Sequence, residues 1–193
     1  DYRESMNNHP LILLLSALLQ FLAAESMHAG RGWSRNRLFR LLKNDLFTAL
    51  SASEVDMLES FVLKNGIRPG QWKKEWRFHT AYSVDSDTET ITEKEKAEQA
   101  VMNELRSRLL SVLNPLAQSW KASVSVKDKC TLLYHWLIHM KIPEALSAWD
   151  DEEFKISRQR PSVQVWKKTI ALLDEIVHVT GNDAITPEDF LAM

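Results

Sequence analysis

The segment TEKEKAEQAVMNELRSRLLSVLNPL, residues 92–116, is the longest helix signal in the chain. Thr92 followed by Glu95 forms a capping box, in which two side chains satisfy backbone N–H groups at the start of a helix. Apolar residues then recur at the spacing of one helix face: Ala97, Val101, Leu105, Leu109, Val112 and Leu116. Pro115 should kink this helix, because proline removes one backbone hydrogen bond and clashes with the preceding turn.

Helix signals recur on both sides of this segment, and strand signals are nearly absent. Residues 10–24 form an apolar run that opens on Pro10, with Asn8 as the expected cap. Further helices are expected to begin near Ser34, Ser51, Val126, Pro143, Pro161 and Thr186. The helix from Pro143 should be short and end near Trp149.

These signals predict an all-α fold. Residues 67–91 show no sustained period, so we predict a long loop there. The whole chain, residues 1–193, is then a single helical domain, an irregular bundle of about seven helices.

Composition is that of one globular domain. The chain has 193 residues, 45% apolar and 26% charged, and a net charge of −2. Its single cysteine excludes an internal disulfide framework and any iron–sulfur site held by four thiolates. Its five glycines form no cluster, which argues against a phosphate-binding loop. The apolar run of residues 11–24 is shorter than a membrane span, so we expect a buried helix and no membrane association.

Cys130, His135 and His139 form the most suggestive metal-binding pattern. The two histidines are four residues apart and share a helix face, but Trp136 stands where a zinc protease has its glutamate. We therefore expect a histidine pair at the wetter edge of a core helix. A hydrolase that uses these three residues is kept as an alternative.

Two acidic groups also invite a chemical interpretation. Asp85, Asp87 and Glu89 alternate like the start of a calcium loop, but Thr90 occupies the position of the required glycine. We interpret them as a solvated acidic loop. The four acids at 150–153 resemble paired carboxylates for acid–base catalysis, but we expect them to complement a helix N-terminus instead.

Charge is unevenly distributed along the chain. Residues 31–77 carry ten basic and five acidic side chains, a net charge of +5, whereas residues 85–104 carry −5. The last 20 residues have five acids and no base. One region is thus suited to a polyanion and two others would repel it.

Within the basic region, two tryptophans stand among four cations of the expected loop. The group consists of Arg68, Trp72, Lys73, Lys74, Trp76 and Arg77. Aromatic rings beside cations can stack on bases while the cations neutralise phosphates. Equally, the two tryptophans can fix the loop to the core and leave the lysines solvated.

Several short strings, taken in order, resemble one protein family. They are residues 1–3 and 8–11, Trp33, residues 38–46, residues 59–63, Gly66-Ile67 and Gln164-Val165-Trp166. Their order and spacing resemble the middle of the ATP-dependent helicase/deoxyribonuclease B subunit, of the AddB or RexB type. Ser60 departs from the family, which usually has asparagine there. Because the chain also begins at Asp1, we interpret it as an internal piece of a longer protein.

The resemblance implies a helical insertion in the second motor-like lobe, like the 2B subdomain of superfamily-one helicases. It implies a cytoplasmic enzyme that processes double-strand breaks for recombination, paired with a helicase–nuclease A subunit. The family's ATP, magnesium and iron–sulfur sites would lie elsewhere in the longer protein. The segment itself would be monomeric and hold no cofactor and no catalytic residue.

We therefore expect a non-catalytic arm that supports the motor lobe and contacts the A subunit or duplex DNA. Arg68, Lys73, Lys74 and Arg77 are predicted to meet phosphates, and Trp72 and Trp76 to be stacking or partner surfaces. The alternative is a purely structural, protein-interacting domain that makes no DNA contact.

Overall fold

The computed structural model describes residues 8–77, 92–157 and 161–192. In chain order the elements are α2 (Pro10–Met27), the 3-10 turn η1 (Arg31–Trp33), α3 (Arg35–Leu42), α4 (Ala52–Lys64), the 3-10 turn η2 (Pro69–Gln71), α5 (Glu93–Ala122), α6 (Val126–His139), α7 (Ile142–Ser157), α8 (Pro161–Thr180) and α9 (Pro187–Ala192). The described residues contain no strand, only an isolated bridge between Ser125 and Ala184. The all-α prediction is confirmed.

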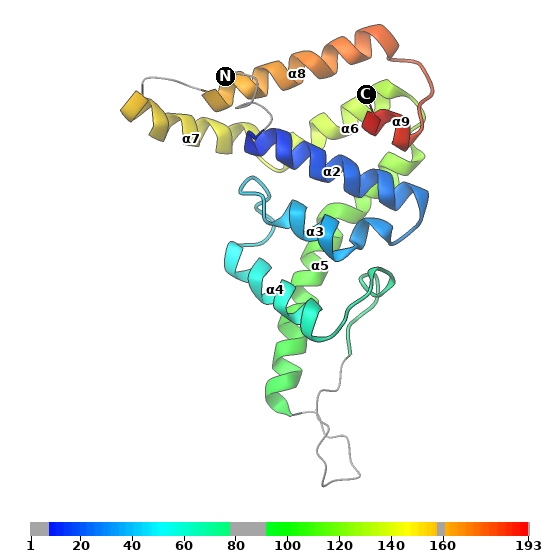
Figure 1. Ribbon diagram of the computed structural model, residues 1–193, viewed down its shortest axis with the longest axis vertical. Coiled ribbons are helices and arrows are strands. Elements are labelled where there is room, and N and C mark those ends of the chain that lie inside the picture. Colours follow the sequence, from blue (N-terminus) through cyan, green and yellow to red (C-terminus); the bar gives the residue numbers. More distant parts are fainter. Residues whose placement is uncertain (1–7, 78–91, 158–160, 193) are drawn as a thin grey trace.

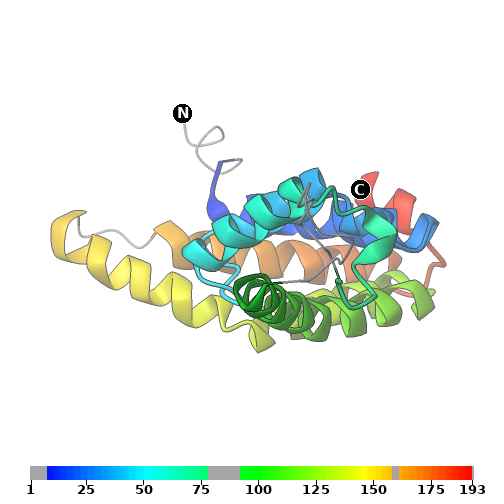
Figure 2. The same ribbon diagram turned by 90° about the horizontal axis from the view of Figure 1, so that it is seen from below.

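The helices are arranged in two parts on either side of α2 (Figure 1). We use the term upper layer for α6 to α9, and lower layer for η1, α3, α4 and η2. Helix α5 runs from the lower layer into the upper one, and Figure 2 shows its first half end-on, beside α4. A continuous apolar core joins both layers through α2.

Helix α2 is the central element of this core. By length and composition it is the one helix of the described chain that could cross a membrane, but half of its residues are buried inside the fold, as expected for a core helix. Pro10 occupies its first turn as predicted. The cap was predicted wrongly, because His9 and not Asn8 is the N-cap: its Nδ1 accepts a hydrogen bond from the Leu11 N–H at 3.2 Å.

Helix α5 confirms the pattern of residues 92–116. Thr92 and Glu95 form the predicted capping box, and the helix extends over 30 residues. It passes through Pro115 and changes direction in its second half (Figure 1). Lys129 of α6 caps its C-terminal end: the buried ammonium donates to the backbone oxygens of Trp120 and Ser123 at 3.2 and 2.8 Å.

Helix α7 is longer than predicted. It continues past Trp149 to Ser157, so the acids at 150–153 lie inside it and not before it. Asp150 is nevertheless buried against a helix start, as expected: its carboxylate accepts from the N–H groups of Ser162 and Val163 at 3.0 and 2.8 Å, in the first turn of α8. Asp150 therefore links α7 to the start of α8.

Candidate nucleic-acid interface

The two tryptophans of the predicted site lie in the core. Trp72 and Trp76 are 1% and 2% exposed, and their rings contact each other with centroids 5.0 Å apart. Trp72 also contacts Trp33 at 5.5 Å, and Trp76 stacks on Phe61 at 5.8 Å. Their ring faces are covered, so neither offers a stacking platform for a base. Their burial agrees with the alternative interpretation, in which the two tryptophans fix the loop to the core.

Residues 67–77 are fastened to α5 by polar contacts as well. Asn103 accepts from the Trp76 N–H and donates to the Trp76 carbonyl oxygen, both at 2.9 Å. Arg106 donates to the Trp72 carbonyl oxygen at 3.0 Å, and its guanidinium lies 5.8 Å from the Trp76 ring. This part of the predicted loop is therefore part of the packed lower layer. Residues 78–91, with Asp85, Asp87 and Glu89, lie outside the described residues.

A buried carboxylate connects this segment to the turn after α2. Glu25 is 7% exposed, and one carboxylate oxygen accepts from the N–H groups of Gly30 and Gly32 at 2.7 and 3.2 Å. The other accepts from the Lys73 ammonium at 2.7 Å. Gly30 has a φ of +94°, and a Cβ on Gly32 would lie 2.8 Å from the Phe21 carbonyl oxygen, so both positions need glycine.

The sequence analysis missed Glu25. Its only signal is an acid that follows directly on the apolar run of residues 11–24, and that run gives no indication of a lysine 48 residues further on. We call this arrangement of Glu25, Lys73 and the two glycine N–H groups the Glu25 clasp.

The clasp changes the role of the predicted cations. Lys73 is committed to Glu25, and Arg77 pairs with Glu75 at 2.8 Å on the surface. Arg68 and Lys74 are exposed, and neither has a salt-bridge partner among the described residues. The four cations thus do not act as one cluster.

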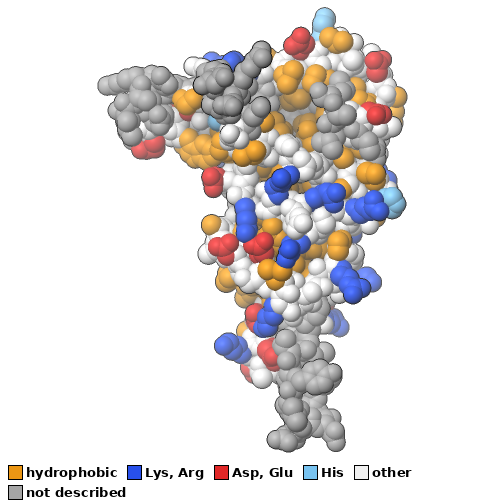
Figure 3. Space-filling view, in the orientation of Figure 1, with side chains coloured by type: hydrophobic (Ala, Val, Ile, Leu, Met, Phe, Trp, Pro, Cys, Tyr) orange, Lys and Arg blue, Asp and Glu red, His pale blue; other side chains and the backbone are white. Residues whose placement is uncertain are grey.

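The structure places Arg68 beside three arginines of α3. Together they surround a surface depression of about 760 Å³. Its lining is formed by Gln20, Ser34, Arg35, Asn36, Arg37, Arg40, Ile67, Arg68 and Pro69. Figure 3 shows basic side chains gathered over the middle of the molecule, where α3 lies. We call this feature the arginine depression.

The arginines in the depression have neutral neighbours. Arg37 donates to the Ser34 hydroxyl at 3.2 Å, and Arg40 donates to the Gln20 amide oxygen at 3.2 Å. Among the described residues, no acidic side chain lines the depression. Sequence analysis included these residues in the charge of residues 31–77, but nothing in the local pattern placed Arg68 next to α3.

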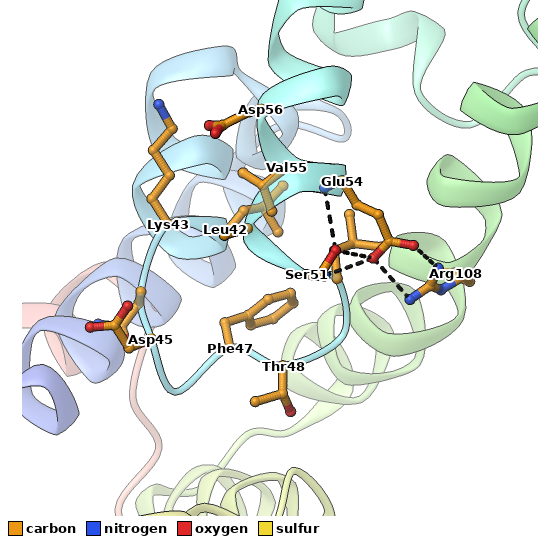
Figure 4. A pocket seen from close by; sticks show the side chains of 13 residues that line it. Leu42, Lys43, Asp45, Phe47, Thr48, Ser51, Glu54, Val55, Asp56 and Arg108 are labelled. Carbon is orange, nitrogen blue, oxygen red and sulfur yellow. Dashed lines mark hydrogen bonds and ion pairs between the residues drawn. The ribbon is translucent and has the colours of Figure 1, made fainter. Parts of the chain in front are cut away.

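A second pocket, of about 560 Å³, is lined by residues from the segment 42–51, the first turns of α4 and Arg108 of α5 (Figure 4). Two of its charged groups bind each other: Arg108 contacts the Glu54 carboxylate at 2.6 Å and also donates to the Ala49 carbonyl oxygen at 2.8 Å. Glu54 also completes the predicted capping box with Ser51. The Ser51 N–H, and then Arg108, hold the pKa of Glu54 below its ordinary value. The Glu54–Arg108 pair thus joins α4 to α5 at the edge of this pocket.

The Cys130, His135 and His139 pattern does not form one site. Cys130 is buried, and burial raises the pKa of its thiol to about 11, whereas both histidines are exposed, as expected for the wetter edge of a helix. Among the described residues, no group of three or more histidine, cysteine, aspartate or glutamate side chains is placed to hold a metal ion.

Comparison with known proteins confirms the resemblance that the sequence suggested. The chain is 29% identical over 197 residues to the ATP-dependent helicase/deoxyribonuclease B subunit of Caldanaerobacter subterraneus subsp. tengcongensis, 30% over 195 residues to that of Oceanobacillus iheyensis, and 29% over 200 residues to that of Exiguobacterium sibiricum. The matches cover 95–100% of this chain but only 16% of each relative. No protein-family model matches the chain.

Proposed function

We propose that this chain, similar along its length to one part of the ATP-dependent helicase/deoxyribonuclease B subunit, is a non-catalytic helical domain of such an enzyme. In this proposal it supports the motor lobe during double-strand-break processing and recombinational repair, in the cytoplasm. It also contacts duplex DNA next to a helicase–nuclease A subunit. ATP, magnesium and an iron–sulfur cluster would be bound by other parts of the enzyme.

The observation that carries the proposal is the match of the whole chain to about one-sixth of each B subunit. The charge distribution supports the DNA contact, because residues 31–77 carry a net charge of +5 and four of their ten basic side chains line the arginine depression, with no acid among its described lining residues. With Trp72 and Trp76 buried, the contact would be made by cations alone. Binding of that kind follows the phosphate backbone and weakens steeply with salt.

The test uses the complete B subunit in complex with its partner. Arg68, Lys74 and Arg77 are replaced by glutamate, and Lys73 is kept because its loss would unpair the buried Glu25. Duplex affinity is measured as a function of salt concentration, and the slope of log K against log salt should flatten by about 2 to 3. An unchanged affinity and slope would overturn the DNA contact.

A matched control places three charge reversals elsewhere on the domain. Lys121, Lys127 and Lys141 are exposed at the end of α5, on α6 and just after α6, and none of them lines the depression. Their replacement by glutamate changes the net charge equally and should leave the salt slope nearly as it is in the wild type.

The second candidate is a purely structural, protein-interacting domain. It is favoured by the burial of both tryptophans and by the clasp, because these residues serve the fold and not a surface. A photo-crosslinking residue in place of Lys74, in the assembled enzyme with DNA, separates the two candidates. Adducts with the A subunit alone would favour the structural role, and adducts with DNA the first proposal.

A further inference from the structure

We propose that the arginine depression binds a phosphate group of a DNA strand, and that α3 supplies backbone N–H groups as well as guanidinium groups to it. The inference rests on the proposed function and adds a specific site to it. The residues are Arg35, Arg37 and Arg40 of α3, and Arg68 before η2.

The first argument is uncompensated charge. Four guanidinium groups line one depression, and no acidic residue of the described chain lines it with them. None of the four forms a salt bridge among the described residues. Like charges held together repel one another, so an anion in their midst is favoured. Guanidinium groups bind phosphate oxygens through two parallel N–H bonds, which makes phosphate the best-matched anion.

The second argument is the open start of α3. Ser34 is its N-cap residue, but its hydroxyl accepts from the Arg37 side chain and not from a backbone N–H of the first turn, and that turn contains no acid. The first N–H groups of a helix have no acceptor within the helix, and they carry the positive end of its dipole. In α4 and α5, by contrast, a capping box accepts hydrogen bonds from backbone N–H groups at the helix start. The first turn of α3 lies in the wall of the depression, where a phosphate can accept from its N–H groups.

The third argument is preorganisation. Arg68 is 28 residues from Arg40 in the sequence and reaches α3 only because η1 packs on η2. Gly30 makes this contact: a Cβ at its position would lie 3.7 Å from the backbone of Gly70. The Glu25 clasp holds both turns in place. The charges are thus assembled before any ligand arrives, which lowers the ordering cost of binding.

The lining also indicates which ligand fits. Among the described residues, no aromatic side chain lines the depression, so it offers no ring on which a base can stack. Its chemistry recognises a phosphate and no particular base. A contact of this kind positions a strand without reading its sequence.

The test replaces Arg35, Arg37 and Arg40 with glutamine in the complete B subunit, in complex with its partner. Binding of a labelled blunt duplex is followed by fluorescence anisotropy from low to physiological salt. Loss of this phosphate contact should weaken binding at least about tenfold at low salt and flatten the salt slope by about 1. The exposed Lys121, Lys127 and Lys141, replaced by glutamine, form the control.

A second variant separates geometry from charge. Lysine at positions 35, 37 and 40 keeps the charge but cannot form the bidentate hydrogen bonds that a guanidinium makes with phosphate. It should restore the wild-type salt slope and leave the affinity at least about threefold weaker. If the lysine variant equals the wild type in both salt slope and affinity, the depression supplies only diffuse charge, and the proposal of a phosphate site is wrong.

Two further outcomes are decisive. If the glutamine variant binds as the wild type does while the Arg68, Lys74 and Arg77 reversal weakens binding, the site is wrong and the proposed function stands. If a modest excess of inorganic phosphate over the protein binds to the wild type but not to the glutamine variant, and leaves duplex binding unchanged, the site takes a free phosphate, which contradicts a strand contact. Assembly of each variant with its partner, checked by gel filtration, confirms that the domain is folded.

Discussion

Glu25 and Asp150 are both buried carboxylates that hold two segments together, one beside the lower layer and one in the upper layer. Asp150 needs only the first turn of α8, 12 and 13 residues further along the chain. The positive end of the α8 dipole favours its charge. Glu25 accepts from the N–H groups of a short turn, which has no long helix dipole behind it, and it takes a lysine 48 residues away as well.

The difference shows how the two parts are built. The upper layer is a succession of neighbouring helices, so a local acid can fix α7 to α8. The lower layer contains α4 and three short elements, η1, α3 and η2, and the arrangement of the short ones depends on contacts between distant residues. The arginine depression lies in this second part, so its geometry depends on the clasp and on the tryptophans beneath it.

The largest effect is expected from Trp72→Ala, which removes the ring between Trp33 and Trp76. A cavity of that size should lower the free energy of unfolding by about 3 to 5 kcal/mol, measured by urea denaturation of the chain. The half-buried Trp166 of the upper layer is the control, and its replacement by alanine should cost less. Equal losses would mean that the lower layer has no special dependence on Trp72.

Glu25→Ala should come next. It leaves the Lys73 ammonium and two glycine N–H groups without their acceptor, which should cost about 2 to 4 kcal/mol of unfolding free energy. Glu98→Ala is the matched control, because its pair with Lys64 is exposed and 3.8 Å long, and it should change stability by less than about 0.5 kcal/mol. A loss below about 1 kcal/mol for Glu25→Ala would show that the clasp contributes little.

Asp150→Asn should have a smaller effect, about 1 to 2 kcal/mol. Asparagine keeps one oxygen as an acceptor for the α8 N–H groups but loses the charge that interacts with the helix dipole. The measurement is again urea denaturation. A loss as large as that of Glu25→Ala would contradict the distinction between the local and the long-range carboxylate.

The smallest effect concerns pH and His9. Burial lowers the pKa of His9 from its ordinary value of 6.5, and the charge of Asp150 opposes this in part. The unfolded chain therefore takes up the proton first, so stability is full above pH 6.5 and falls as the pH drops from 6.5 toward the folded pKa. Protonation at Nδ1 also removes the cap on Leu11.

The His9 contribution should be below about 1 kcal/mol. His9→Asn keeps a capping side chain without a titrating group, so the difference in unfolding free energy between about pH 7.5 and about pH 5.5 should shrink. If the difference in unfolding free energy between the two pH values is as large in His9→Asn as in the wild type, the pH dependence comes from other groups.

Local patterns were enough to predict most of the fold. The capping boxes at Ser51 and Thr92, the proline starts and the helix that stops before Gly181 all depend on neighbours within a few residues. Of the acids at 150–153, Asp150 complements a helix start as predicted, but that helix is α8, 12 and 13 residues further on, and α7 was expected to end before these acids. His9 was missed because histidine is not among the usual caps.

The candidate site was less predictable because its contacts are long-range. Trp72 and Trp76 stand among cations in an aperiodic stretch, and only the ring contacts with Trp33 and Phe61 show that they are buried. The arginines of α3 were counted as part of a basic region. Their meeting with Arg68 follows from the clasp, which no local pattern reveals.

The central claim is that the arginine depression faces DNA while the tryptophans hold the fold. Asn36 lies in the lining of the depression and is exposed, so a photo-crosslinking benzoylphenylalanine in its place tests the claim most directly. In the complete B subunit with its partner and a labelled duplex, we predict an adduct with DNA that is lost when Arg35, Arg37 and Arg40 are replaced by glutamine. Adducts with protein alone would contradict the account.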